Sequence, residues 1–251
     1  MAGVEGQVAL VTGAGRGIGR VTAELLASRG ARIMAVSRSE AELQALGLDY
    51  VVADLGIQED CERAVEETRD RLGPVSILVC NHGIGSARER VVWEQDPEIW
   101  HETMRINLDG PFYLARLVLR DMIQKAYGRL VFTSSTAGQV AEYAGSAYTS
   151  SKHGLLGLMR SVARDAGQYG ITSNAVLPGW VRTQMAESSA ESEARERKIS
   201  TKEVWEERAA LSPAGRVVSP EEVAEVIAFL ASEEASGLNG EAITVALGSL
   251  S

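Results

Sequence analysis

The chain contains short apolar runs in which hydrophobic residues do not alternate with polar ones, such as Val-Ala-Leu-Val at residues 8–11 and Ile-Leu-Val at residues 77–79. A strand has this pattern when both faces of its sheet are covered, as in a central parallel strand. Longer stretches of helical periodicity separate the runs, which is typical of a parallel sheet with helices on both faces. The sequence therefore predicts an α/β fold with a doubly wound, seven-stranded parallel sheet of the Rossmann type.

The expected strands are residues 8–12, 32–37, 50–53, 76–80, 129–133, 172–177 and 242–245. Gly30, Gly73 and Gly128 each follow a helical stretch and are expected to end it. The length suits a single domain over residues 1–251. Residues 180–211 differ from the rest because they are charged, sparsely apolar and free of Gly and Pro. We expect them to form a helical lid over a substrate.

The charge balance excludes several classes of partner. There are 25 Lys and Arg against 34 Asp and Glu, a net charge of −9, so we expect no binding to nucleic acid or to anionic membranes. No apolar run reaches the ~18 residues of a membrane span, and a cytoplasmic protein is expected. Cys61 and Cys80 are expected to be reduced thiols rather than parts of a disulfide framework. The three histidines have no metal-ligand spacing with them, so no metal is expected.

A glycine-rich turn follows the first expected strand and opens a helix. It contains Gly13, Gly15, Arg16, Gly17, Ile18 and Gly19. Such a turn brings backbone N–H groups close to a pyrophosphate at the positive end of a helix. A glycine cluster alone can be ordinary loop punctuation. Its place between a strand and a helix favours a dinucleotide site.

The end of the second strand predicts which dinucleotide binds. In this fold the residue that meets the adenosine ribose lies about 20 positions after the turn, where the chain has Ser37 and Arg38. An acidic residue there would bind the 2′-hydroxyl of NAD(H), whereas Arg38, together with Arg16, would pair with the 2′-phosphate of NADP(H). NADP(H) is therefore expected. NAD(H) is the alternative, with both arginines lying on the surface.

Tyr148 and Lys152 are four residues apart, so on a helix their side chains lie on the same face. A lysine charge near a tyrosine favours the phenolate and lowers the tyrosine pKa from about 10. For the pair taken alone, an amphipathic helix with a solvated lysine is the favoured explanation. The reactive interpretation gains support from Ser135, which follows the preceding strand at the edge of the sheet where ligands bind.

Together these motifs resemble those of the short-chain dehydrogenase/reductase family, in particular a 3-oxoacyl-reductase-like member. The resemblance rests on the turn from Thr12 to Gly19, Asp54, Cys80-Asn81-His82-Gly83, Asn107, Ser135, Tyr148 with Lys152, and Pro178-Gly179-Trp180-Val181-x-Thr183. It extends from the first strand nearly to the last residue, and the order of several separate motifs makes it specific.

The resemblance implies a role for each of four polar residues. Tyr148 donates a proton to the carbonyl oxygen during reduction, and Ser135 hydrogen-bonds the same oxygen. Lys152 binds the nicotinamide ribose and lowers the pKa of Tyr148. Asn107 holds a water that connects Lys152 to solvent.

The remaining motifs are implied to hold the cofactor. Asp54 accepts a hydrogen bond from the adenine amine, and Asn81 and Gly83 line the adenosine ribose. Val181 and Thr183 hold the nicotinamide amide. The other positions expected to contact the cofactor are Leu55, Pro178 and Gly179.

The chain departs from the family pattern at two places. Cys80-Asn81-His82-Gly83 replaces the usual Asn-Asn-Ala-Gly, and Leu247-Gly248 replaces a Gly-Gly near the last strand. We expect cofactor binding to survive the first change and C-terminal packing to differ because of the second. His82 and His153 flank the site, but a functional role is not favoured for either, because position 82 is a packing site in the family and His153 lies on a different helix face from Lys152.

The sequence therefore predicts hydride transfer between NADP(H) and a ketone or secondary alcohol, with Tyr148 as the acid/base. One alternative is an NAD-dependent dehydrogenase of a secondary alcohol or hydroxy acid. The other is a catalytically silent dinucleotide-binding protein. The helical stretches 99–126 and 147–167 carry apolar residues on more than one face, and the resemblance implies that they pair in a homotetramer or homodimer.

Overall fold

Seven parallel strands form one sheet in the order β3-β2-β1-β4-β5-β6-β7. The computed structural model describes residues 3–86 and 88–249, so the ends of the predicted domain, residues 1–2 and 250–251, lie outside the described residues. The strands are β1 Val8–Thr12, β2 Arg32–Ser37, β3 Asp49–Val52, β4 Ile77–Cys80, β5 Gly128–Thr133, β6 Ile171–Pro178 and β7 Ala242–Val245. The predicted doubly wound sheet is confirmed.

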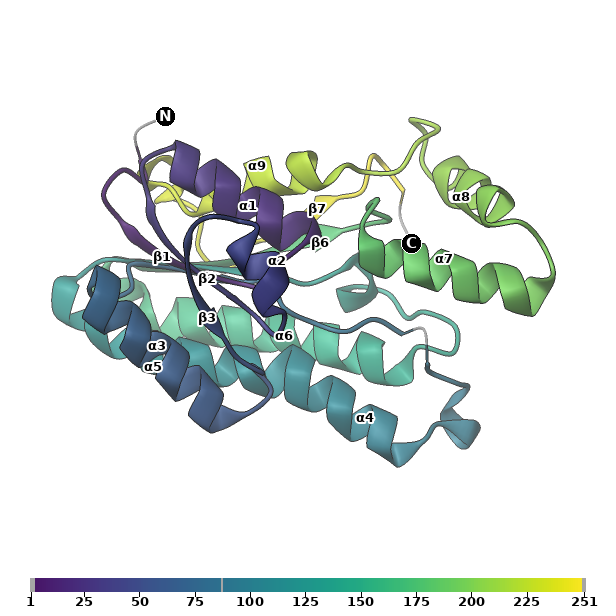
Figure 1. The fold of residues 1–251 in the computed structure, drawn as a ribbon, viewed down its shortest axis with the longest axis horizontal. Coiled ribbons are helices and arrows are strands. Elements are labelled where there is room, and N and C mark those ends of the chain that lie inside the picture. The colour runs from purple at the N-terminus through teal and green to yellow at the C-terminus, as the bar shows by residue number, and fades with distance from the viewer. Residues whose placement is uncertain (1–2, 87, 250–251) are drawn as a thin grey trace.

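Helices cover both faces of the sheet because strand residues alternate between two apolar clusters (Figure 1). Leu10 and Leu78 belong to the cluster beneath α3, α5 and α6, whereas Val11 and Val79 belong to the one beneath α1 and α9. The helices are α1 Gly17–Ser28, α2 Glu40–Gln44, α3 Gln58–Leu72, α4 Pro97–Met104, α5 Gly110–Lys125, α6 Ser146–Ala166, α7 Gln184–Arg197, α8 Thr201–Ala210 and α9 Pro220–Leu230. The unbroken apolar runs of the sequence therefore reflect burial on both sides.

The strand order reverses between β1 and β4. The chain first runs outward through β2 and β3 and then crosses back to place β4 beside β1. The loops that leave the carboxyl ends of β1 and β4 therefore diverge, which opens the crevice where sheets of this kind bind ligands.

Two details differ from the sequence prediction. Gly128 does not end a helix: α5 ends at Lys125 with Ala126 in the left-handed conformation, and Gly128 begins β5. A Cβ at Gly128 would lie 2.5 Å from Met122 Sδ, so glycine is needed there for close packing. In addition, the stretch predicted as one helix over residues 99–126 contains a π-helical turn, Arg105–Asp109, between α4 and α5.

The apolar residues on α5 and α6 lie mainly in the core of the chain itself. Among the large apolar residues of these two helices, Leu114, Val118, Leu155, Leu156 and Met159 are buried, Leu117 and Leu158 are half-buried and Phe112 is exposed. Packing on the sheet therefore accounts for most of this pattern.

Among the described residues, no helix has both the length and the apolar character needed to cross a membrane.

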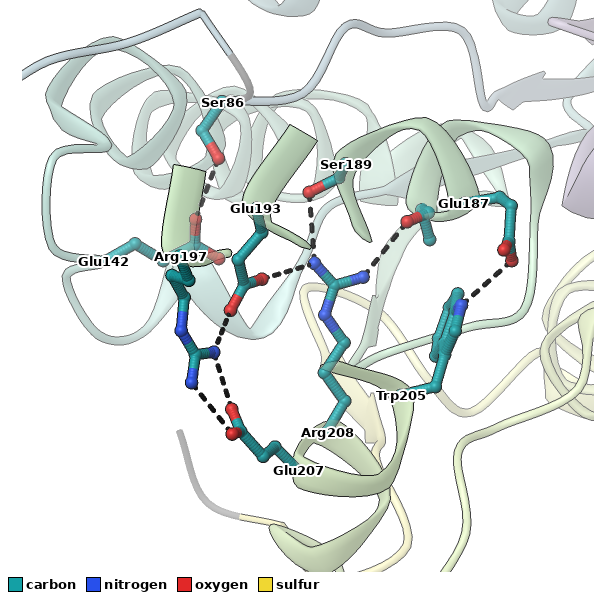
Figure 2. Close-up of polar contacts among 10 residues, drawn as sticks. Ser86, Glu142, Glu187, Ser189, Glu193, Arg197, Trp205, Glu207 and Arg208 are labelled. Atoms are coloured by element: carbon teal, nitrogen blue, oxygen red, sulfur yellow. Dashed lines mark hydrogen bonds and ion pairs between the residues drawn. The ribbon is translucent and has the colours of Figure 1, made fainter. Parts of the chain in front are cut away.

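The predicted lid region forms α7 and α8, which project from one end of the molecule (Figure 1). The buried Arg208 of α8 joins them, because its guanidinium binds the Ala186 carbonyl at 3.0 Å, Ser189 Oγ at 3.2 Å and Glu193 at 2.9 Å (Figure 2). The same guanidinium lies 3.7 Å from the ring centroid of Trp180. Arg208 therefore holds α7 and α8 against the segment that follows β6.

Two exposed basic residues of α7 and α8 take part in ion pairs. Arg197 binds Glu193 at 2.7 Å and Glu207 at 2.6 Å, and Lys202 lies 3.5 Å from Glu206. Both residues are therefore engaged with carboxylates at the surface of this segment.

We predict that Arg208→Ala lowers the free energy of unfolding by about 2–3 kcal/mol, because it removes a buried cation from its hydrogen-bond acceptors and its aromatic neighbours. Urea unfolding followed by tryptophan fluorescence checks this, since Trp180 and Trp205 both lie near the guanidinium. Arg197→Ala, at an exposed ion pair, is the matched control and should have a much smaller effect. Equal losses in the two variants would contradict the role given to Arg208.

Candidate active site

The glycine-rich turn has the geometry of a phosphate cradle. Gly13 and Gly17 have φ of +63° and +55°, in the left-handed region that glycine tolerates. A Cβ at Gly19 would lie 2.2 Å from the Gly13 carbonyl oxygen, so α1 can begin close to the turn only with glycine there. Arg16, the N-cap residue of α1, makes no side-chain cap. The first N–H groups of α1 therefore suit an anionic ligand.

Thr12 connects the two strand ends that flank the crevice. Its hydroxyl donates to the Val79 carbonyl at 3.0 Å and accepts the Asn81 N–H at 2.9 Å. His82 Nδ1 lies 2.8 Å from the same oxygen. Burial lowers the pKa of His82 to about 3, so its ring is neutral. His82 is therefore a neutral, packed residue, as the sequence favoured. The sequence had not indicated that the Thr12 hydroxyl connects the two strand ends.

Asn107 lies in the π-helical turn and is fully buried. Its Oδ1 accepts the Ile84 N–H at 2.8 Å, and its Nδ2 donates to the Ile84 carbonyl at 3.0 Å and to Ser151 Oγ at 3.1 Å. A Cβ at Gly83 would lie 3.1 Å from Asn107 Oδ1 and 3.6 Å from Lys152 Nζ. Asn107 thus ties the loop after β4 to α6, and its water-holding role remains a prediction.

Ser135, Tyr148 and Lys152 lie between the end of β5 and the first turns of α6. Ser135 Oγ accepts the Ala137 N–H at 3.1 Å, which leaves its own proton available to another acceptor. Lys152 Nζ lies 5.6 Å from the centroid of the Tyr148 ring and donates to the Thr133 carbonyl at 3.0 Å. The structure therefore brings together the three residues that the sequence singled out.

The expected lowering of the Tyr148 pKa is wrong for this structure. Burial raises the pKa of Tyr148 to about 12, the Ser135 hydroxyl acts against this, and the carboxylates of Glu142 and Glu89 raise it further. Burial lowers the pKa of Lys152 to about 8. At neutral pH the phenol therefore keeps its proton and the ammonium keeps its charge.

The residues expected to bind the adenosine part of the cofactor lie beside β2 and β3. Asp54 Oδ1 accepts the Gly56 N–H at 3.0 Å, and its Oδ2 lies 3.5 Å from Arg105. Leu55 is buried and belongs to the core. Arg38 is exposed, and within residues 3–86 and 88–249 no hydrogen bond or ion pair engages its side chain.

Glu42 is a residue of this region that the sequence analysis missed. A Cβ at Gly15 would lie 2.5 Å from Glu42 Oε2 and 3.0 Å from Ser37 Oγ, and Glu42 Oε1 lies 3.7 Å from Arg16. The Glu42 N–H donates to Ser39 Oγ at 3.4 Å. The Ser-x-x-Glu spacing of residues 39–42 was the available signal, because it places Glu42 in the first turn of the helix that Ser39 caps.

The residues expected to bind the nicotinamide part of the cofactor lie at the end of β6 and just after it. This strand ends at Pro178. Val181 pairs with Val218 in an isolated parallel bridge. Thr183 caps α7 by accepting the Ala186 N–H at 3.3 Å, and its Cγ2 would lie 3.3 Å from a Cβ at Gly17. Thr183 therefore lies against the glycine-rich turn. A Cβ at Gly179 would lie 3.0 Å from the Cβ of Ala246, so this position too is closely packed.

Residues 13–249 match a family model described as enoyl-(acyl carrier protein) reductase. The chain is 36% identical over 251 residues to the 3-oxoacyl-(acyl-carrier-protein) reductase FabG of Escherichia coli (strain K12), covering 96% of each protein. The chain belongs to the short-chain dehydrogenase/reductase family. The resemblance seen in the motifs is confirmed.

Other relatives and solved structures are also similar over nearly their whole length. The D-beta-hydroxybutyrate dehydrogenase of Cupriavidus necator is 33% identical, with 94% of this chain and 95% of that protein covered. Levodione reductase has a TM-score of 0.93 at 31% identity, with 97% of each chain covered. A variant of actinorhodin polyketide ketoreductase with NADPH has a TM-score of 0.93 at 34% identity and the same coverage. The chain is an oxidoreductase that acts on a ketone or alcohol with a nicotinamide cofactor.

The two pKa shifts predict how ketone reduction depends on pH. Reduction needs a protonated Tyr148 and is helped by the positive charge of Lys152. Because the pKa of Lys152 is about 8 and that of Tyr148 about 12, log kcat/KM should be flat below pH about 8 and fall above it. Steady-state rates from about pH 6 to about pH 10 test this. A rate that rises steadily across this range would contradict it.

Proposed function

We propose that this protein is an NADP(H)-dependent ketone reductase, or secondary-alcohol dehydrogenase in the reverse direction, with Tyr148 as its acid/base. The observation that carries the proposal is the meeting of Ser135, Tyr148 and Lys152 at the carboxyl edge of the sheet. The glycine-rich turn at the same edge is the cradle for the dinucleotide. Self-association as a homotetramer or homodimer remains a prediction.

Ser135, Tyr148 and Lys152 have different roles in the reaction at the carbonyl oxygen. Tyr148 donates its proton to that oxygen, and the free hydroxyl proton of Ser135 hydrogen-bonds it as negative charge grows. Lys152 supplies a positive charge close to the phenol, which stabilises the phenolate left after proton transfer. The bound nicotinamide supplies the hydride chemistry. The protein therefore contributes orientation, a proton and electrostatic stabilisation.

Two variants test these roles. Tyr148→Phe should keep the fold and cofactor binding but lose nearly all turnover, because only the proton donor is removed. Ser135→Ala should lose about 100-fold in single-turnover rate, as expected when one oxyanion donor is removed. Near wild-type turnover in Tyr148→Phe, or a rate within a few-fold of wild type in Ser135→Ala, would refute the corresponding assignment.

Cofactor preference is proposed from the groups near Ser37. The exposed guanidinium of Arg38 and the neighbouring Arg16 can fork onto a 2′-phosphate, and Ser37 places no carboxylate there. Glu42 acts in the opposite direction, because its carboxylate lies 3.7 Å from Arg16 and would repel a phosphate. We infer that NADPH is preferred to NADH, with Glu42 reducing the preference.

Kinetics with both cofactors check this inference. NADPH should be preferred by at least about ten-fold in kcat/KM, and the double change Ser37→Asp with Arg38→Leu should reverse the order. Glu42→Gln should raise the NADPH-to-NADH ratio by about two- to five-fold. Glu40→Gln, on the same helix but bound to the Tyr50 hydroxyl at 3.3 Å, is the control. An NADH preference in the unmutated protein would overturn the inference.

The alternatives make different demands on the site. The D-beta-hydroxybutyrate dehydrogenase relative, named for a hydroxy acid, keeps an NAD-dependent hydroxy-acid dehydrogenase open. The carboxylates of Glu89 and Glu142, which both act on Tyr148, disfavour an anionic substrate next to the phenol. A silent dinucleotide-binding protein has no need of Ser135, Tyr148 and Lys152 together. Neutral ketones and secondary alcohols are therefore the proposed substrates.

A further inference from the structure

The helix that carries Tyr148 and Lys152 has no cap from its own sequence. Its N-cap residue is Gly145, which has no side chain, and its first turn contains no acidic residue. The first backbone N–H groups of an α-helix have no partner within the helix. Acceptors for the start of α6 must therefore come from water or from another part of the chain.

Glu89 supplies them from the loop between β4 and α4. Its Oε2 accepts the Ala147 N–H at 2.8 Å, and its Oε1 accepts the Tyr148 N–H at 2.7 Å. Only 4% of the residue is exposed. Both carboxylate oxygens are thus engaged by the backbone of α6, one of them at the residue that bears the phenol, and the negative charge lies at the positive end of the helix.

The same loop is tied to α6 by a second route. The Glu89 N–H donates to the Ser86 carbonyl at 2.8 Å, and Ser86 Oγ lies 3.3 Å from Glu142 Oε2. The Glu142 N–H then donates to Thr149 Oγ1 at 3.2 Å. The loop, the segment before α6 and the first turn of α6 therefore form a closed set of contacts around Tyr148.

We propose that Glu89 is a positioning residue for the reaction: it fixes Tyr148 relative to Ser135 and couples the loop after β4 to the acid/base. This inference rests on the proposed function. A carboxylate suits the position because it can accept both N–H groups at once, whereas an amide of the same shape presents only one acceptor. Misplacing an acid/base by about 1 Å can cost up to about 100-fold in rate.

Glu89→Gln is the central test. It should lower kcat for ketone reduction about ten-fold or more, leave the NADPH dissociation constant near that of wild type, and speed hydrogen exchange at the Ala147 and Tyr148 amides. Glu89→Asp keeps the charge but is shorter by one methylene, so kcat should lie between wild type and Glu89→Gln. If Glu89→Gln fails to fold, Glu89→Asp carries the same comparison.

Two controls separate positioning from other effects. Glu102→Gln removes the partner of Arg88 on the same loop without touching α6, and should leave kcat and the two amides near wild type. Glu142→Gln removes the other carboxylate that raises the pKa of Tyr148, and should leave exchange at Ala147 nearly unchanged. The groups that face Tyr148 are Ser135, Lys152, Glu89 and Glu142.

The pH profile adds a readout that a purely structural role would not move. Alcohol oxidation needs the phenolate, and loss of a nearby negative charge lowers the Tyr148 pKa, so both Glu89→Gln and Glu142→Gln should shift the rise in oxidation rate to lower pH. Wild-type kcat with unchanged exchange at Ala147 and Tyr148 in Glu89→Gln would overturn the proposal. If the wild-type protein reduces no ketone, the proposed function fails, yet the exchange measurement still tests the contact itself.

Discussion

The hydroxyl of Thr12 joins the two strands between which the sheet reverses its order. It binds the Val79 carbonyl at 3.0 Å and the Asn81 N–H at 2.9 Å, so the end of β1 and the loop after β4 are held as one unit. The glycine-rich turn starts at the next residue, Gly13, and the loop that contacts Asn107 starts at Asn81. This buried side chain therefore adds to the pairing of β1 with β4 in positioning both sides of the crevice.

The electrostatics of α6 follow from burial. Burial raises the pKa of Tyr148 to about 12 and lowers that of Lys152 to about 8, and it also raises the pKa of Glu89, against the hydrogen bonds that Glu89 accepts from Tyr148 and Ala147. The phenol is thus kept as a proton donor at neutral pH. This state is suited to reducing a carbonyl, and the positive charge of Lys152 favours the phenolate that proton transfer leaves behind.

Much of the fold was predictable because burial on both faces leaves unbroken apolar runs, and all seven strands were found within one or two residues of their observed ends. Ser135, Tyr148 and Lys152 were predictable because strand ends and helical spacing are local properties. The contacts of Glu89 were not, since they join residues 58 and 59 positions apart along the chain. The π-helical turn at Asn107 likewise has no sequence signature.

Two other expectations depended on properties of the whole fold. Periodicity shows that α5 and α6 are apolar on several faces, but it does not distinguish the core of the chain from a subunit contact, and self-association stays a prediction. A lysine near a tyrosine suggests a lowered pKa, but the cost of burying the phenolate depends on the whole fold. In the structure burial is the largest influence on the Tyr148 pKa, and it outweighs the opposing hydrogen bond from Ser135.

The central claim is that the groups gathered at this edge of the sheet perform hydride-coupled proton transfer and do not merely bind a dinucleotide. A panel of neutral ketones incubated with NADPH or NADH, followed by nicotinamide absorbance and by product analysis, tests it most directly. At least one ketone should be converted to its alcohol with equimolar oxidation of cofactor. Tight cofactor binding with no conversion of any ketone, and no oxidation of the corresponding alcohols, would contradict it.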